Sequence, residues 1–291
     1  MAKIVGIHGI GHQYQGENIV KARWLPPLKD GLLRAGVNDF SDDDFSCAFY
    51  GDLFRPSGGP TPAASPAPQG LPAPAEVLDP WEQEMLSLWV QAAAKEKTET
   101  ESEAMPQAAA TPMPAATPQF IQGALRRLSH NRFFADLAEE ALISDLKQVR
   151  LYLHDDDFRD QIQARIATAV DDDTRVVIGH SLGSIVAYET VCAHPEWNVT
   201  TLITLGSPLG IRNLVFDKLE PTPVNGAGVW PPSIERWTNV ADEDDIVALV
   251  KALSVGFDGV QDRLIDNGAK AHRAAGYLSA RETGEAIAAG L

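Results

Sequence analysis

One serine of this sequence stands where a side-chain hydroxyl can act as a nucleophile. It is the centre of a G-x-S-x-G pattern, Gly179-His180-Ser181-Leu182-Gly183. A β-branched run at 175–180 precedes the pattern and an amphipathic stretch at 182–193 follows it, which indicates a strand-to-helix turn. The glycines permit a sharp turn that holds the hydroxyl above a sheet edge, at the positive end of a helix. This arrangement predicts acyl-transfer chemistry at Ser181, because the free N–H groups of the helix end favour an oxyanion.

A serine nucleophile needs a general base, which is itself oriented by a carboxylate. In the chain order serine, acid, histidine, both partners lie downstream of Ser181, where the sequence has two histidines, His194 and His272. His194 stands at the end of the helix that follows the serine, several turns away, which favours a surface position. His272 lies in a polar loop after the last expected core element. By elimination, His272 is predicted to be the base.

Several carboxylates that could serve as the acid follow the strand expected at 234–240. They stand in the run Ala241-Asp242-Glu243-Asp244-Asp245-Ile246-Val247. Asp245 is favoured because the apolar pair after it can anchor the loop. Asp244 and Asp242 remain alternatives for the same role.

An oxyanion hole needs two backbone N–H donors. Leu182, the residue after the nucleophile, is expected to supply one. The loop after the first strand, His8-Gly9-Ile10-Gly11, is expected to supply the other through the N–H of Ile10, because its glycines let the backbone approach a substrate. The loop is not a dinucleotide fingerprint, since the position that would complete G-x-G-x-x-G from Gly9 is Tyr14.

The elements that must position these residues alternate along the chain. Strands are expected at 4–7, 45–50, 175–180, 201–206 and 234–240, and helical patterns at 17–35, 120–146, 157–170 and 182–193. This alternation predicts an α/β fold with a mostly parallel central sheet and helices on both faces. Pro26 and Pro27 are expected to kink or split the first helix.

Proline and alanine dominate residues 56–118, so we expect a flexible Pro/Ala-rich insertion within a single domain of residues 1–291. Inside it, residues 79–95 have a helical pattern that includes Trp81 and Trp89. Such a helix can pack on the body of the protein or act as a lid over an apolar pocket. The proline-rich stretches can also dock a protein partner in the polyproline II conformation.

Composition excludes several classes of function. The 291 residues include 24 Lys and Arg against 40 Asp and Glu, a net charge of −16 that opposes binding to nucleic acid and to anionic lipid. Two cysteines, Cys47 and Cys192, are too few for a disulfide framework or a cysteine zinc site and favour a reducing compartment. With no visible secretory signal and no apolar stretch of roughly 20 residues, we expect a cytoplasmic protein without an integral membrane segment.

Metal and cofactor sites are not expected. The acidic triplets at 42–44, 155–157 and 171–173 stand at element boundaries and lack a ligand pattern, which indicates caps and solvated turns.

Taken together, these motifs resemble the α/β-hydrolase superfamily, and within it lipase-like and esterase-like serine hydrolases. The resemblance covers about residues 1–52 and 145–280, and it is carried by His8–Gly11, Gly179–Ser184, Leu205–Gly210, Asp245–Val247 and His272. It implies an α/β-hydrolase fold and cleavage of a small-molecule carboxylic ester or lipid, such as a phospholipid or an acylglycerol, through an acyl-enzyme. A serine peptidase or thioesterase with the same residues, and a non-catalytic binding module that uses the proline-rich insertion, are the alternatives.

Overall fold

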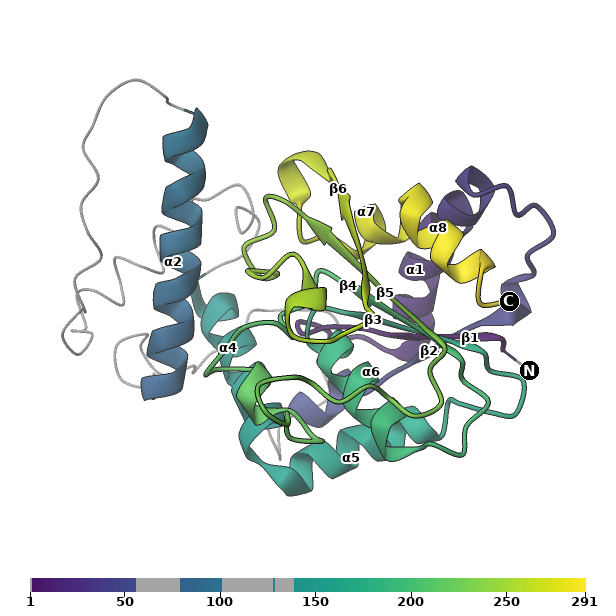
Figure 1. The fold of residues 1–291 in the computed structure, drawn as a ribbon, viewed down its shortest axis with the longest axis horizontal. Helices are drawn as coiled ribbons and strands as arrows, with labels where there is room; N and C mark the ends of the chain where they lie inside the picture. Colours follow the sequence, from purple (N-terminus) through teal and green to yellow (C-terminus); the bar gives the residue numbers. More distant parts are fainter. Residues whose placement is uncertain (1, 56–78, 101–127, 129–138) are drawn as a thin grey trace. The chain divides into compact units, whose positions relative to one another are not determined.

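A computed structural model describes residues 2–55, 79–100, 128 and 139–291 (Figure 1). The chain divides into two compact units, one of residues 1–57 and 151–291 and the other of residues 58–150. The first unit holds the whole sheet and every residue that the sequence predicts for the site. Most of the predicted insertion, residues 56–78 and 101–118, lies outside the described residues.

The first unit is built on six parallel strands. They are β1 (Ile4–Ile7), β2 (Phe45–Ala48), β3 (Val176–His180), β4 (Thr201–Leu205), β5 (Arg236–Asp242) and β6 (Gln261–Ile265). Their order in the sheet is β2-β1-β3-β4-β5-β6, and Gly6 of β1 pairs with Cys47 on one side and with Ile178 on the other. The predicted α/β fold with a parallel sheet is confirmed, and every pairing is parallel.

The strand order reverses at β1, because β2 lies on one side of β1 and β3, the next strand in the chain, lies on the other side. In open α/β sheets, the loops at the carboxyl ends of the strands diverge at such a point and leave a crevice for a ligand. The loop after β1 and the turn after β3 both start at this point, and they carry Ile10 and Ser181.

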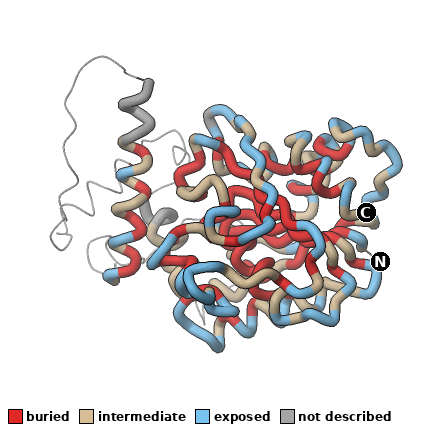
Figure 2. Tube along the Cα trace, viewed as in Figure 1, coloured by how far each residue is buried: buried red, intermediate tan, exposed pale blue. Residues whose placement is uncertain are grey.

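Helices cover both faces of the sheet, as the sequence predicts (Figure 1). One face carries α1 (Glu17–Arg34), α7 (Ala274–Ser279) and α8 (Arg281–Ala288), which contact one another. The other face carries α6 (Leu182–Ala193), and α5 (Asp156–Ala167) packs against α6. Figure 2 shows buried residues gathered along the strands between these helices.

Of the two effects expected of Pro26 and Pro27, a kink or a split of the first helix, the split is wrong, because α1 continues through both prolines. Trp24, Leu28 and Leu32 of this helix are buried against the sheet residues. Burial of a large apolar side chain contributes about 1.5–3 kcal/mol, which offsets the hydrogen bonds that the prolines remove.

No pattern in the sequence predicts β6, whose residues are exposed or half-buried. The strand forms at the edge of the sheet, where its backbone pairs with β5 and places Asp262 beside Asn239. The Asp262 carboxylate also accepts hydrogen bonds from the N–H groups of Leu253 and Ser254, at 2.8 and 3.0 Å. A polar edge strand of this kind has no apolar pattern to reveal it.

In the second unit, the helix expected at 79–95 is present as α2 (Pro80–Thr100). Asp79 precedes it and accepts a hydrogen bond from the N–H of Glu82 at 2.9 Å, while the Glu82 carboxylate accepts one from the N–H of Asp79 at 3.1 Å. These reciprocal bonds form a capping box. The predicted helical pattern at 120–146 falls mostly outside the described residues, and α4 (Glu139–His154) contains its last part. Among the described helices, none has the length and apolar character needed to cross a membrane.

Candidate active site

Ser181 lies in the turn between β3 and α6, in a conformation that side-chain-bearing residues rarely adopt, with φ 55° and ψ −129°. Its N–H donates to the carbonyl of Leu205 at 3.0 Å. A Cβ atom on Gly179 would lie 2.4 Å from the carbonyl oxygen of Gly183, and one on Gly183 would lie 2.2 Å from that of Ile7. Only glycine fits at these two positions, so close backbone packing holds the strained serine in place.

His272 connects Ser181 to a carboxylate. Its Nε2 lies 3.0 Å from Ser181 Oγ, and its Nδ1 lies 2.7 Å from Asp245 Oδ2. A carboxylate beside Nδ1 fixes the proton on that nitrogen and leaves Nε2 as the acceptor for the serine proton. The structure therefore brings together three predicted site residues that are 91 and 27 positions apart in the chain.

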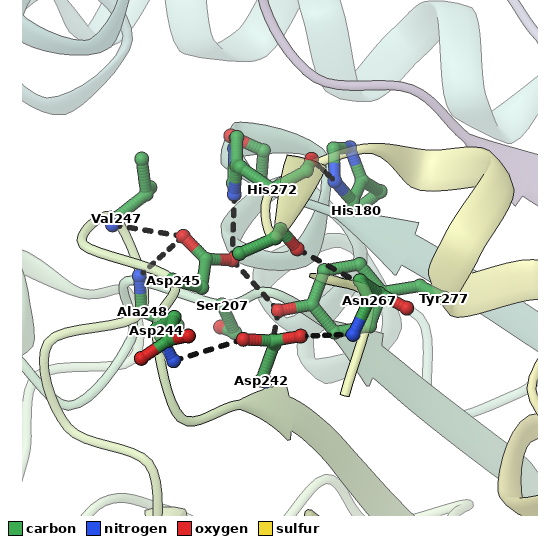
Figure 3. Close-up of polar contacts among 12 residues, drawn as sticks. His180, Ser207, Asp242, Asp244, Asp245, Val247, Ala248, Asn267, His272 and Tyr277 are labelled. Carbon is green, nitrogen blue, oxygen red and sulfur yellow. Dashed lines mark hydrogen bonds and ion pairs between the residues drawn. The ribbon is translucent and has the colours of Figure 1, made fainter. Parts of the chain in front are cut away.

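Of the three candidate acids, Asp245 is the one that contacts His272 (Figure 3). Its side chain is fully buried and also accepts hydrogen bonds from the N–H groups of Val247 and Ala248, at 2.9 and 3.4 Å. Burial by itself raises the pKa of Asp245, but the charge and hydrogen bond of His272, with the other donors, lower it to about 2. Asp245 is therefore a carboxylate at neutral pH.

Asp242 has a different place in the same loop. Its carboxylate accepts hydrogen bonds from the N–H groups of Asn267 and Asp244, the latter at 2.8 Å (Figure 3). These bonds tie the end of β5 to the segment that precedes His272. Asp244 contributes to this loop through its backbone, so neither alternative acid holds the histidine ring in the structure.

Tyr277 of α7 is a site residue that sequence analysis does not identify. Its hydroxyl donates to Asp245 Oδ2 at 2.7 Å and accepts from the N–H of Asp242 at 3.0 Å (Figure 3). Burial and the nearby Asp245 charge raise the pKa of Tyr277, so the hydroxyl stays protonated and donates. No spacing or motif marks this tyrosine, because its role depends on how α7 packs beside the loop after β5.

His180, next to the nucleophile, is buried and contacts the loop that carries His272. Its Nε2 lies 2.9 Å from the carbonyl oxygen of His272, and the two rings are 4.8 Å apart (Figure 3). Burial, then the charge of His272, lowers the pKa of His180 to about 3, so the ring is neutral. The proton on Nε2 therefore donates to the His272 carbonyl and fixes the backbone of that residue.

The loop after β1 lies directly against the nucleophile. A Cβ atom on Gly9 would be 2.8 Å from Ser181 Cβ and 3.3 Å from Ser181 Oγ. Within the described part of the chain, no acceptor takes a hydrogen bond from the N–H of Ile10 or from that of Leu182. Both predicted oxyanion donors thus belong to backbone that borders Ser181: Leu182 follows it in the chain, and Ile10 follows Gly9, which packs against it.

His194 lies apart from this group, as expected. It follows the 12 residues of α6, which span about 18 Å, and its Nδ1 is 2.8 Å from Glu196 Oε1. Its ring stacks on Trp197 with centroids 4.2 Å apart. These contacts occupy the imidazole at the far end of the helix.

The acidic triplets serve as caps and turns, which confirms their interpretation. Asp155 accepts from the N–H of Phe158 at 3.0 Å at the start of α5, and Asp171 accepts from the N–H of Asp173 at 2.9 Å. Ser41 and Asp44 form a capping box around the first triplet. Among the described residues, no group of three or more His, Cys, Asp or Glu side chains is arranged to hold a metal ion.

A cavity of about 770 Å³ opens beside the loop after β5, and Asp242, Asp244 and Asn267 are among its lining residues. Ser181 and His272 are not among them. The cavity therefore lies beside the loop that carries the acid and not beside the nucleophile.

Comparisons of the chain with protein-family models, with curated proteins and with solved structures found no match.

Proposed function

We propose that the protein is a serine hydrolase that cleaves carboxylic esters through an acyl-enzyme on Ser181. The observation that carries this proposal is the hydrogen-bonded chain from Ser181 Oγ to His272 to Asp245, with distances of 3.0 and 2.7 Å. The parallel α/β sheet, with Ser181 in a strained turn after a central strand, supports an α/β-hydrolase of lipase or esterase type.

The first half of the reaction acylates the serine. His272 Nε2 accepts the proton of Ser181 Oγ as the oxygen bonds to the ester carbonyl carbon. The carbonyl π electrons move to its oxygen, and the N–H groups of Ile10 and Leu182 bind the resulting oxyanion. Collapse of this intermediate breaks the bond to the alcohol, which leaves with the proton from His272.

The second half releases the acid. His272 Nε2 takes a proton from water, whose oxygen bonds to the acyl carbon, and the oxyanion forms again at the same two N–H groups. Collapse breaks the bond to Ser181 Oγ, which recovers its proton from His272. Asp245 stays ionised throughout and stabilises the imidazolium that forms in each half.

For this activity we propose a reducing compartment, the cytoplasm, because two cysteines are too few for a disulfide framework. Cys47 and Cys192 are both free thiols, and burial raises the pKa of each to about 12. A protonated thiol is a poor nucleophile, so neither cysteine competes with Ser181 as the reacting group in this proposal.

Hydrolysis of p-nitrophenyl esters of graded acyl length tests the proposal. Ser181→Ala and His272→Ala are each expected to lower kcat by about 1,000-fold or more with the fold retained. The control is His194→Ala, which removes the other downstream histidine and is expected to keep kcat. Peptide and acyl-thioester substrates in the same assay separate esterase activity from the two other acyl-transfer reactions. Ester turnover that survives Ser181→Ala would contradict the proposal.

A further inference from the structure

His8 is a fully buried histidine that follows β1 and begins the loop that borders Ser181. Its ring stacks on Tyr50, with centroids 4.3 Å apart and planes 10° apart, and meets the edge of His12 at 4.8 Å. The Tyr50 hydroxyl donates to the His8 carbonyl at 2.5 Å. The histidine is therefore fixed in both its ring and its backbone by the segment after β2.

The hydrogen bonds of His8 define where its proton lies. Burial, then the charge of His12, lowers the pKa of His8 to about 3, so the ring is neutral and carries one N–H. The backbone N–H of Tyr50 points at Nε2 at 3.3 Å, which makes Nε2 the acceptor. The proton is thus on Nδ1, which donates to the carbonyl of Gly9 at 2.6 Å.

The Gly9 carbonyl belongs to the same peptide unit as the N–H of Ile10. This peptide bond is trans, so its C=O and N–H point in opposite directions, and holding one fixes the other. Gly9 has no Cβ atom to resist rotation of the peptide, and the loop continues into Gly11 with φ 80°. Glycine restricts the orientation of its peptide less than other residues do, so a hydrogen bond to the Gly9 carbonyl contributes to fixing it.

We propose that His8 is a positioning residue for the oxyanion site: its Nδ1–H holds the Gly9 carbonyl so that the N–H of Ile10 faces the reacting carbonyl oxygen beside Ser181. This inference rests on the proposed function and deepens it. Ile10 makes the contact with substrate, and His8 acts through the Gly9–Ile10 peptide. Loss of the Nδ1–H donor lets the peptide rotate, which weakens the transition state more than the bound substrate.

Two substitutions separate the two ring nitrogens of His8. The side-chain amide of His8→Asn places an N–H where Nδ1 stands, so it keeps the donor to Gly9. His8→Gln reaches further and places an oxygen where Nε2 stands, so it keeps the acceptor for Tyr50 and loses the donor to Gly9. Both variants lose the ring that stacks on Tyr50, which makes each a control for the structural cost of the other.

Steady-state hydrolysis of p-nitrophenyl butyrate by the full chain gives the first readout. We expect kcat of His8→Gln to fall at least about tenfold below that of His8→Asn, with KM of the two within about threefold. The upper bound is about 100- to 1,000-fold, the effect of losing one oxyanion donor. Equal kcat values in the two variants, with an active wild type, would overturn the role of His8 and leave the proposed hydrolase standing.

The second readout does not need activity. The ¹⁵N–¹H resonance of Ile10, in protein labelled with ¹⁵N-isoleucine, is expected to shift in His8→Gln and to stay near its wild-type position in His8→Asn. A wild type that neither hydrolyses the ester nor forms a fluorophosphonate adduct at Ser181 would remove the proposed function. In that case the resonance still decides the inference, because an Ile10 signal that responds equally to both variants contradicts it.

Discussion

The turn that carries Ser181 and the loop that carries Asp245 are held by different forces. In the turn, backbone atoms leave no space for a Cβ atom on Gly179 or Gly183. In the loop, Asp245 accepts hydrogen bonds from His272, Tyr277 and the backbone, and Lys251 Nζ donates to its carbonyl at 2.5 Å. Shape therefore fixes the nucleophile, whereas polar contacts from distant segments fix the acid.

The largest effect on stability is expected in the turn that carries Ser181, where close backbone packing leaves no space for a larger side chain. Gly183→Ala places a methyl group 2.2 Å from the Ile7 carbonyl oxygen and 2.4 Å from that of His8, and backbone atoms cannot move aside cheaply. We expect a loss of about 4 kcal/mol or more in the free energy of unfolding, or no folded protein. Gly16→Ala is the control, because a Cβ atom there meets nothing within 4 Å, and it is expected to cost under about 1 kcal/mol. Urea denaturation measures both, and equal stability of the two variants would refute the steric account.

The next effect separates the two carboxylates of the loop after β5. Asp245→Asn removes the charge that orients His272, and kcat is expected to fall by about 10⁴-fold, as for the acid of a serine triad. Asp242→Asn changes a carboxylate that contacts only backbone N–H groups among the described residues, and kcat is expected to fall less than about tenfold. Steady-state kinetics on one ester measures both. A larger loss in Asp242→Asn would give the role of the acid to that residue.

Lowering the pH is expected to reduce the stability contributed by the Ser181 turn and by the Asp245 loop in different pH ranges. Buried His180 has its pKa lowered to about 3 from an ordinary 6.5, so the unfolded state binds the proton first and stability falls as pH drops from about 6.5 toward 3. Asp245, with a pKa of about 2 against 3.8, loses its contribution only between about pH 4 and 2. Burial raises the pKa of Glu189 to about 7, so this carboxyl binds a proton first in the folded state and adds stability as the pH falls. Because this effect opposes that of His180, the quantity to compare is the pH dependence of stability in a His180 variant and in wild type.

That difference comes from His180→Gln, which keeps the donor to the His272 carbonyl and removes the titrating group. Between pH 6 and 4.5 the variant is expected to lose less stability than wild type, by about 1.4 kcal/mol per pH unit. Urea midpoints at four pH values measure it. Parallel curves for the two proteins would show that His180 is not held neutral by the fold.

The smallest effect is expected at Tyr277. Tyr277→Phe removes one of the donors to Asp245 and leaves the N–H of Asp242 without its acceptor, at a cost of about 1–3 kcal/mol in stability. We expect kcat to fall about tenfold or less, since His272 still contacts Asp245. Tyr14→Phe, at an exposed tyrosine, serves as the control and is expected to leave both quantities unchanged. Thermal melting and ester kinetics check the pair, and a Tyr277→Phe variant identical to wild type would remove this residue from the site.

The same contrast explains what the sequence predicts. The turn at Ser181 is local, so its glycines and the apolar strand before it reveal it, and the helix expected at 182–193 has the bounds of α6. The sequence also favours Asp245 over Asp242, but only through the apolar pair that follows it. In the structure, Asp245 is distinguished from Asp242 by its contacts with Tyr277 and His272. No spacing along the chain predicts the contact between α7 and the loop after β5.

The polar edge of the sheet is the other part that sequence patterns miss. β6 has exposed and half-buried side chains, and its stability comes from backbone pairing and from the Asp262 carboxylate, which caps the segment before it. The segment that leads to His272 follows this strand, so the sequence identifies the histidine without predicting the strand that places it. The predicted bounds of the neighbouring strand, 234–240, are two residues too early at both ends, because β5 begins at Arg236 and continues to Asp242.

The most direct test of the central claim is whether Ser181 is an activated nucleophile. The native protein is treated with a fluorophosphonate, and peptide mass spectrometry locates the adduct, with Ser181→Ala and Asp245→Asn treated in parallel. One adduct is expected, on Ser181, which is absent in Ser181→Ala and forms much more slowly in Asp245→Asn. A folded wild-type protein that takes no adduct at Ser181, or that reacts equally fast without the Asp245 carboxylate, would contradict this claim.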